Sequence, residues 1–344
     1  MGAKPPLDFG TSSAIIQENV IRTTFSSFSS LRLTYYVQRF LYFMRILLTN
    51  DDGIFSPGLS ALAQELAPLG EIYIVAPMSE QSGVAHTITF LSALKTKEVY
   101  QDGRFWGWAV EGSPADCVRI GVQAISELRP DLVVSGINSG WNAGVNFHYS
   151  GTCAAAKEAR LFGINSFAVS IQSDAVGLYR PAAALFKQII QQTLEQQLDS
   201  PCMYNVNAPN EAVRQFAQGV MPTLTTAFVD TQLFGERLAR QKSPFGMPYY
   251  WCEANRPEID ALTPGSDLYN LFQGMVTITP IDVNPTERRI ANEMSNWRWS
   301  FQPESAGIDE RAENEGLDGQ TLNPDFVPGT HIRRMPRQKS ALET

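Results

Sequence analysis

Short apolar runs and amphipathic helical segments alternate between residues 45 and 206. Residues 45–49 form an apolar strand pattern, and the next segment repeats apolar side chains at helical spacing from Leu59 to Leu66. Ser56 and Pro57 are typical of a helix start, so this helix is predicted over residues 57–69. The same patterns predict further strands near 72–75, 88–99, 105–110, 131–134, 167–171 and 204–206, and further helices near 113–128, 152–162 and 181–198. Strands that alternate with helices in this way predict an α/β fold with a doubly wound, mostly parallel sheet.

The later part of the chain departs from this rhythm. Residues 215–280 are aromatic-rich and irregular, and we interpret roughly 215–275 as a C-terminal oligomerisation arm followed by a returning strand at 275–279. From residue 286 the sequence becomes polar and loses its periodicity, which predicts a mobile C-terminal tail over 286–344. The folded domain is therefore predicted to span residues 44–285.

Residues 1–43 do not match the pattern of the folded domain and are predicted to be a disordered extension. Residues 19–43 lack acidic side chains and are rich in Ser, a composition that resembles a transit peptide and would direct the protein to an organelle. The alternative is that translation starts at Met44 and the extension is not part of the native protein. We favour this alternative, because the first strand begins immediately after Met44.

Composition and charge narrow the classes of function. The net charge of −8 argues against general binding to the phosphate backbone of nucleic acids. No apolar stretch reaches the ~20 residues of a membrane span, so we expect no membrane partner. The four cysteines have no metal-type spacing and are expected to be free thiols, which favours a cytoplasmic location.

Two adjacent acids follow the first strand directly. Asp51-Asp52-Gly53 would place two carboxylates at one strand end if the chain turns there, which Gly53 permits. In open α/β sheets, ligands bind at the carboxyl ends of the strands. Carboxylate oxygens suit a hard divalent cation such as Mg²⁺ or Mn²⁺. The alternative is a solvated Asp-Asp-Gly turn, because these residues are common in turns.

A second segment favours a ligand site over a solvated turn. The apolar strand 132–134 leads into a loop in which Gly and Asn alternate from Gly136 to Asn146. The loop continues to Ser150-Gly151-Thr152, which begins a helix-forming segment rich in Ala. Free amides and hydroxyls at a helix N-terminus form an anion site, so we expect this segment to bind phosphate. The alternative is a flexible glycine-rich loop.

Several ordered motifs resemble the SurE survival-protein nucleotidases over roughly residues 44–285. They are Met44 to Gly53, Val75 to Pro77, Gln81 to Gly83, Gly112 to Val118, Ser135 to Gly140, Tyr149 to Thr152, Asn205 to Pro209 and Ile278 to Pro280. The resemblance implies a Rossmann-like sheet and a swapped C-terminal arm that makes a homodimer or homotetramer. It also implies a metal-dependent phosphomonoesterase that acts on nucleoside monophosphates.

The resemblance also implies roles for individual residues. The family's cation ligands, two Asp, one Ser and one Asn, fall on Asp51, Asp52, Ser82 and Asn138. One divalent cation per subunit, Mg²⁺ or Mn²⁺, is therefore expected, with Asp51 as the catalytic carboxylate. The residues expected to bind phosphate or substrate are Gly83, Ser139, Asn142, Ser150, Gly151 and Thr152.

The chemistry of these residues agrees with hydrolysis of nucleoside 5′-monophosphates, and of 3′-esters as a further option. A cation on the acid pair would stabilise the phosphoryl oxygens, and His86 and His148 are candidates for protonating the leaving group. One alternative is an aspartyl-phosphate phosphatase with Asp51 as the nucleophile, although such enzymes usually separate their two Asp by one residue. The other alternative is a non-catalytic domain that senses nucleotide or phosphate.

The extension yields a direct prediction. A chain that begins at Met44 is expected to keep the melting temperature and phosphatase activity of the full chain, because residues 1–43 contain no pattern that matches a core element. Differential scanning calorimetry and a phosphate-release assay check this. A fall of more than a few degrees would show that the extension packs on the domain, since 1 kcal/mol corresponds to roughly 2–4 °C for a domain of this size.

Overall fold

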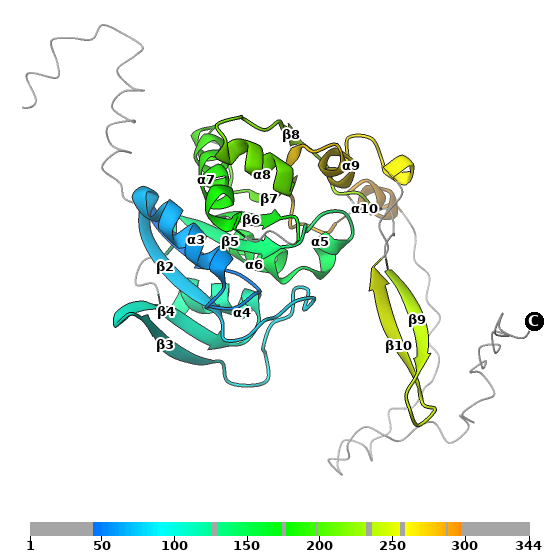
Figure 1. Cartoon of the computed structure of the whole chain (residues 1–344), viewed down its shortest axis with the longest axis horizontal. Coiled ribbons are helices and arrows are strands. Elements are labelled where there is room, and N and C mark those ends of the chain that lie inside the picture. The colour runs from blue at the N-terminus through cyan, green and yellow to red at the C-terminus, as the bar shows by residue number, and fades with distance from the viewer. Residues whose placement is uncertain are drawn as a thin grey trace, which may run out of the picture. The chain divides into compact units, whose positions relative to one another are not determined.

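The computed structural model describes residues 44–125, 129–173, 177–196, 199–231, 236–254, 259–286 and 288–296 (Figure 1). The predicted extension 1–43 and most of the predicted tail, residues 297–344, lie outside the described residues. Within the described ranges, no helix is long and apolar enough to cross a membrane. The chain divides into two units, residues 1–285 and 286–344. Of the second unit, the structure describes a short helix, α10 (Arg288–Met294).

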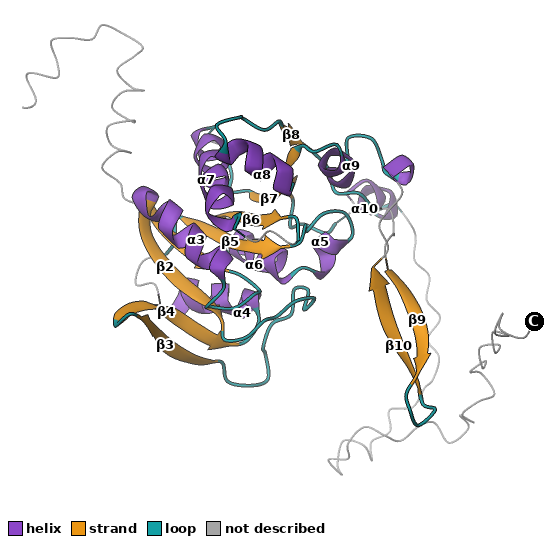
Figure 2. Ribbon diagram, viewed as in Figure 1, coloured by secondary structure: helices purple, strands orange, loops and turns teal. Residues whose placement is uncertain are grey.

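A nine-stranded sheet organises the described part of the first unit, in the order β3-β4-β2-β1-β5-β6-β7-β11-β8 (Figure 2). Its strands are β1 (Met44–Thr49), β2 (Gly70–Pro77), β3 (Lys95–Gln101), β4 (Arg104–Glu111), β5 (Leu132–Ser139), β6 (Asn165–Ile171), β7 (Met203–Ala208), β8 (Leu224–Thr226) and β11 (Val276–Ile281). All neighbours pair in parallel except β3 with β4 and β7 with β11. The prediction of an α/β fold with a mostly parallel sheet is therefore confirmed.

Helices cover both faces of this sheet. The helices are α3 (Pro57–Leu66), α4 (Pro114–Ile120), α5 (Asn146–Tyr149), α6 (Gly151–Leu161), α7 (Tyr179–Glu195), α8 (Asn210–Ala217) and α9 (Asp267–Phe272). Because side chains alternate along β1, Ile46 and Leu48 pack against α3 on one face, and Leu47 packs against α4 and α6 on the other. The α7 and α8 helices share the face of α3 (Figure 1). This two-sided cover explains why the central strands are continuously apolar.

The predicted strand near 88–99 is partly wrong, because β3 begins at Lys95 and the preceding residues form a loop. The polar groups of this loop bind the start of α4 instead of a strand. Thr89 donates its amide and its hydroxyl to Asp116, at 2.9 and 2.8 Å, and Ser113 Oγ donates to the Thr87 carbonyl at 2.6 Å. The loop therefore leaves Phe90 exposed.

A second sheet consists of the hairpin β9 (Glu236–Lys242) and β10 (Pro248–Ala254), within the region predicted to be an arm. The two strands pair antiparallel with each other. Large apolar side chains of this hairpin are mostly exposed: Leu238, Phe245, Met247, Tyr250 and Trp251. An oligomerisation role for this region stays a prediction.

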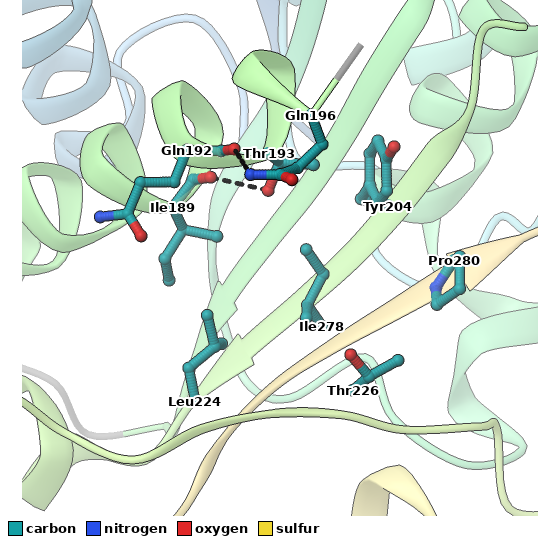
Figure 3. Close-up of a pocket in the computed structure, with 9 residues that line it drawn as sticks. All are labelled: Ile189, Gln192, Thr193, Gln196, Tyr204, Leu224, Thr226, Ile278 and Pro280. Atoms are coloured by element: carbon teal, nitrogen blue, oxygen red, sulfur yellow. Dashed lines mark hydrogen bonds between the residues drawn. The ribbon is translucent and has the colours of Figure 1, made fainter. Parts of the chain in front are cut away.

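An apolar groove with a cavity of about 300 Å³ lies between α7, β7, β8 and β11 (Figure 3). It lies toward the amino end of β7, whose second residue, Tyr204, lines it. Its lining residues are Ile189, Gln192, Thr193, Gln196, Tyr204, Leu224, Thr226, Ile278 and Pro280. The groove therefore contains none of the residues that the sequence predicts as a site.

Candidate functional site at the carboxyl edge of the sheet

The two acids follow β1 in a tight turn. Asn50 closes this turn, because its Oδ1 accepts from the Gly53 amide at 3.1 Å and its Nδ2 donates to the Gly53 carbonyl at 3.0 Å. Gly53 has a φ of +101°, a conformation that favours glycine. The next amide, of Ile54, donates to the Pro77 carbonyl at the end of β2. The turn therefore stops the strand and holds both carboxylates at the carboxyl edge.

Asp51 is buried and held by the N-terminus of α6. Thr152 donates its hydroxyl to Asp51 Oδ1 at 2.5 Å and its amide to Oδ2 at 3.1 Å. Gly151 lies so close that a Cβ there would be 2.9 Å from Asp51 Cβ. Ser150 caps the helix, because its Oγ accepts from the Cys153 amide. The first turn of α6 thus fixes the position of the Asp51 carboxylate, a contact that the sequence did not indicate.

The acid pair is electrostatically unfavourable by itself. Burial is the main cause that raises the pKa of Asp51, and the hydrogen bonds from Thr152 counteract it in part. Burial, followed by the charges of Asp51 and Glu80, raises the pKa of Asp52 to about 6. Positive charge at this point would favour the ionised form of both carboxylates.

A loop after β2 brings further oxygen atoms to the acids. The Gln81 amide donates to the Asp51 carbonyl at 2.7 Å, which places the next residue, Ser82, close to the turn. Ser82 Oγ donates to Glu80 at 2.7 Å. Gly83 is exposed, and a Cβ there would meet no atom within 4 Å. The predicted residues Ser82 and Gly83 therefore border open space beside the acid pair.

Asn138 lies near the end of β5, the neighbour of β1 in the sheet. It is half-buried, and its Nδ2 donates to the Gly140 carbonyl at 2.7 Å, so Oδ1 is its remaining acceptor. The residue before Asn138, Ile137, packs against the start of α3. A Cβ on Gly58 of that helix would lie 2.4 Å from the Ile137 carbonyl oxygen. Ser139, next in the chain, is exposed.

Asn142, His86 and His148 are the remaining residues for which the sequence predicts a functional role. Asn142 is buried, and its Nδ2 donates to Ser170 Oγ at 2.9 Å. His86 contacts Glu158 at 2.8 Å, and His148 is exposed. The roles predicted for these residues in binding or proton transfer stay predictions.

The donor set fits a hard cation. Two carboxylates, a hydroxyl and an amide oxygen lie at or after the carboxyl ends of β1, β2 and β5, and such oxygens are the ligands that Mg²⁺ and Mn²⁺ prefer. Among the described residues, no group of three His, Cys, Asp or Glu could hold a metal ion. Fold and site together define an α/β protein with a candidate cation and anion site at the carboxyl edge of its sheet.

Comparison with known proteins identifies the family. Residues 46–229 match the family described as Survival protein SurE. A protein of Rhodopirellula baltica named 5′-nucleotidase SurE is 41% identical over 255 residues, which are 74% of this chain and 98% of that protein. A protein of the same name from Desulfatibacillum aliphaticivorans is 36% identical over the same shares of the two chains. The crystal structure of the SurE protein from Aquifex aeolicus has a TM-score of 0.62 at 33% identity, covering 73% of this chain and 98% of that one. The chain belongs to the SurE family.

The raised pKa of Asp52 predicts a pH-dependent effect of Asp52→Asn in the metal-free protein. The pKa of Asp52 is about 6 in the folded protein and 3.8 ordinarily, so between these two pH values the folded state holds a proton that the unfolded state has lost. The free energy of unfolding therefore falls as the pH rises from 3.8 to about 6. At pH 8 we expect the variant to melt at a higher temperature than the parent, since it removes a charge that burial and, to a lesser extent, the neighbouring acids disfavour. At pH 4 the parent carboxyl is protonated, and this advantage should disappear. Thermal melts in a chelator check this, and an equal difference at both pH values would contradict it.

Proposed function

We propose that this protein is a 5′-nucleotidase that hydrolyses nucleoside 5′-monophosphates to nucleoside and phosphate, with 3′-monophosphates as a further option. The observation that carries the proposal is the pair of carboxylates, Asp51 and Asp52, held at the carboxyl edge of the sheet beside the N-terminus of α6. The relatives from Rhodopirellula baltica and Desulfatibacillum aliphaticivorans carry the name 5′-nucleotidase. A site for a cation next to a site for an anion is what hydrolysis of a phosphate ester requires.

In this proposal, Asp51, Asp52, Ser82 and Asn138 hold one divalent cation per subunit, Mg²⁺ or Mn²⁺. When bound, the cation supplies positive charge that stabilises the phosphoryl oxygens. The oxygen donors of these four residues support this assignment, as does the unfavourable charge of the acid pair. The metal ligands Ser82 and Asn138 are neutral, so the bound ion keeps more of its positive charge for the substrate.

The residues of the chain have distinct roles toward the substrate. Thr152 orients Asp51 through its amide and hydroxyl. The positive end of the α6 dipole favours the phosphate group, with Ser150 and Gly151 beside it. The exposed Gly83 and Ser139 lie at the rim, where their polar groups can bind the phosphate or the nucleoside.

One contact favours this proposal over a covalent mechanism. Both oxygens of Asp51 accept hydrogen bonds from Thr152. Accepting these bonds lowers the nucleophilicity of the carboxylate, which suits a positioned metal ligand better than a group that attacks phosphorus.

Asp52→Asn is expected to reduce metal-dependent release of phosphate from nucleoside 5′-monophosphates by orders of magnitude. The variant keeps the size of the side chain but removes one anionic ligand. The measurement is phosphate release with a panel of 5′- and 3′-monophosphates, with and without Mg²⁺ or Mn²⁺.

The matched control for this measurement is Asp102→Asn, in the exposed turn between β3 and β4, which should keep full turnover. Equal turnover in both variants would show that Asp52 is not part of the catalytic site. Tight nucleotide binding by the parent without release of phosphate would favour a sensor domain instead.

We further propose that the β9–β10 hairpin is an arm that joins copies of the chain into a homodimer or homotetramer. Its exposed Leu238 and Trp251, 68% and 67% accessible, support a buried role in an assembly. Isolated two-stranded hairpins are marginal in water, so a partner surface would also stabilise the arm itself.

Replacing Leu238 and Trp251 together by Ser is therefore expected to lower the molar mass of the particle in solution. The pairs Leu238–Cys252 and Ala239–Trp251 lie on opposite faces of the hairpin, so the double variant weakens both faces. Sedimentation velocity measures the outcome, and Leu161→Ser, at an exposed position on α6, is the control. An unchanged mass in the double variant would rule out these contacts.

A further inference from the structure

The β7 strand carries two fully buried asparagines. Tyr204 and Val206 face the main core with α7 and α8, so the alternation of the strand turns Asn205 and Asn207 to the opposite face. A buried carboxamide is costly unless its polar atoms are bonded. The Asn-Val-Asn motif therefore needs specific partners, and the functional roles proposed above do not use it.

Those partners are the backbone atoms of Asn142 and the Cys153 thiol, which donates to Asn205 Oδ1 at 3.6 Å. The Asn142 amide donates to Asn207 Oδ1 at 2.8 Å. The Asn142 carbonyl accepts from Asn205 Nδ2 at 2.7 Å and from Asn207 Nδ2 at 3.5 Å. Two side chains of β7 thus bond one residue of the loop as a neighbouring strand would.

A third buried group holds the same loop two residues later. The Gly144 amide donates to Asp267 Oδ2 at 2.9 Å, and the sequence separation is 123 residues. The other oxygen of Asp267 accepts from the amides of Asp230 and Leu268, at 3.0 and 2.8 Å. Asp267 is fully buried at the start of α9, so this contact joins the loop to a distant segment of the chain.

The other end of the loop touches the site. The Gly140 amide donates to the Ile171 carbonyl at 2.9 Å, and the Gly140 carbonyl accepts from Asn138 Nδ2 at 2.7 Å. The direction of the Asn138 side chain therefore depends on where Gly140 lies. Loop residues 140–144 are held from Asn138 at one end to Asp267 at the other.

We propose that Asn205, Asn207 and Asp267 are positioning residues that hold loop 140–144 and, through the Gly140 carbonyl, direct Asn138 Oδ1 toward the cation. The inference rests on the proposed function, in which Asn138 is a metal ligand. It gives a physical role to the Asn-Val-Asn motif and to an aspartate far from Asn138 in sequence. The three residues need not touch substrate or metal.

The first test measures Mn²⁺ affinity of the full-length protein by isothermal titration calorimetry, with nucleotide hydrolysis recorded alongside. Asn207→Ala is expected to weaken Mn²⁺ binding by about 10-fold, the low end for loss of a group that directly bonds a metal ligand, because Asn207 acts on Asn138 through loop 140–144. The matched control is Ser166→Ala, which removes a buried hydrogen bond to the Ala156 carbonyl at the amino end of β6 and should leave the affinity unchanged. If Asn207→Ala does not fold, Asp267→Asn decides, since it keeps the side-chain volume but removes an acceptor; the same loss is expected.

A double-mutant cycle separates positioning from general destabilisation. In the Asn138→Ala background, Asn207→Ala should weaken Mn²⁺ binding little further, because its route to the metal is already lost. Additive losses would overturn the inference, as would Mn²⁺ affinities of Asn207→Ala and Asp267→Asn equal to that of the parent. A parent protein that neither binds Mn²⁺ nor releases phosphate would instead overturn the proposed function, and the inference with it.

Discussion

Two neighbouring carboxylates at the end of β1, one buried and one half-buried, are the constraint around which this edge of the sheet is arranged. Burial and the nearby negative charges both favour the neutral form of Asp52, whose pKa rises to about 6. Burial also raises the pKa of Asp51, and the two hydrogen bonds from Thr152 counteract this in part. A divalent cation bound here would offset the negative charge of both carboxylates and favour their ionised forms.

The fold supplies this arrangement through rigid elements. The parallel strands β1 and β5 end side by side, and Asp51, Asp52 and Asn138 follow or terminate them. The first turn of α6 points at Asp51, so the Thr152 amide and the positive end of the helix dipole stabilise the negative charge of this carboxylate. On the far side of the site, the buried polar groups of β7 and α9 hold loop 140–144. Sites built on strand ends and helix starts keep their geometry better than sites on free loops.

Features set by local sequence could be predicted, and those set by distant contacts could not. The strand before Asp51 and the helix after Ser150 follow from local periodicity and capping, and the structure contains both. The strand predicted from residue 88 begins only at Lys95, because Asp116 bonds Thr89 in the loop. Likewise, the contact between Thr152 and Asp51 joins residues 101 positions apart. Two asparagines in a buried-type strand were the available signal for the network around Asn142, and the residue they bind lies outside any sequence pattern.

The assignment to be tested is one cation site formed by the carboxylate pair together with Ser82 and Asn138. Anomalous diffraction from a crystal of this protein grown with Mn²⁺ tests it most directly, because the peak locates the ion independently of activity. This cation site predicts one manganese peak per subunit, with oxygens of Asp51, Asp52, Ser82 and Asn138 within coordination distance. A peak bound elsewhere, or none at the end of β1 in a protein that still releases phosphate, would contradict it.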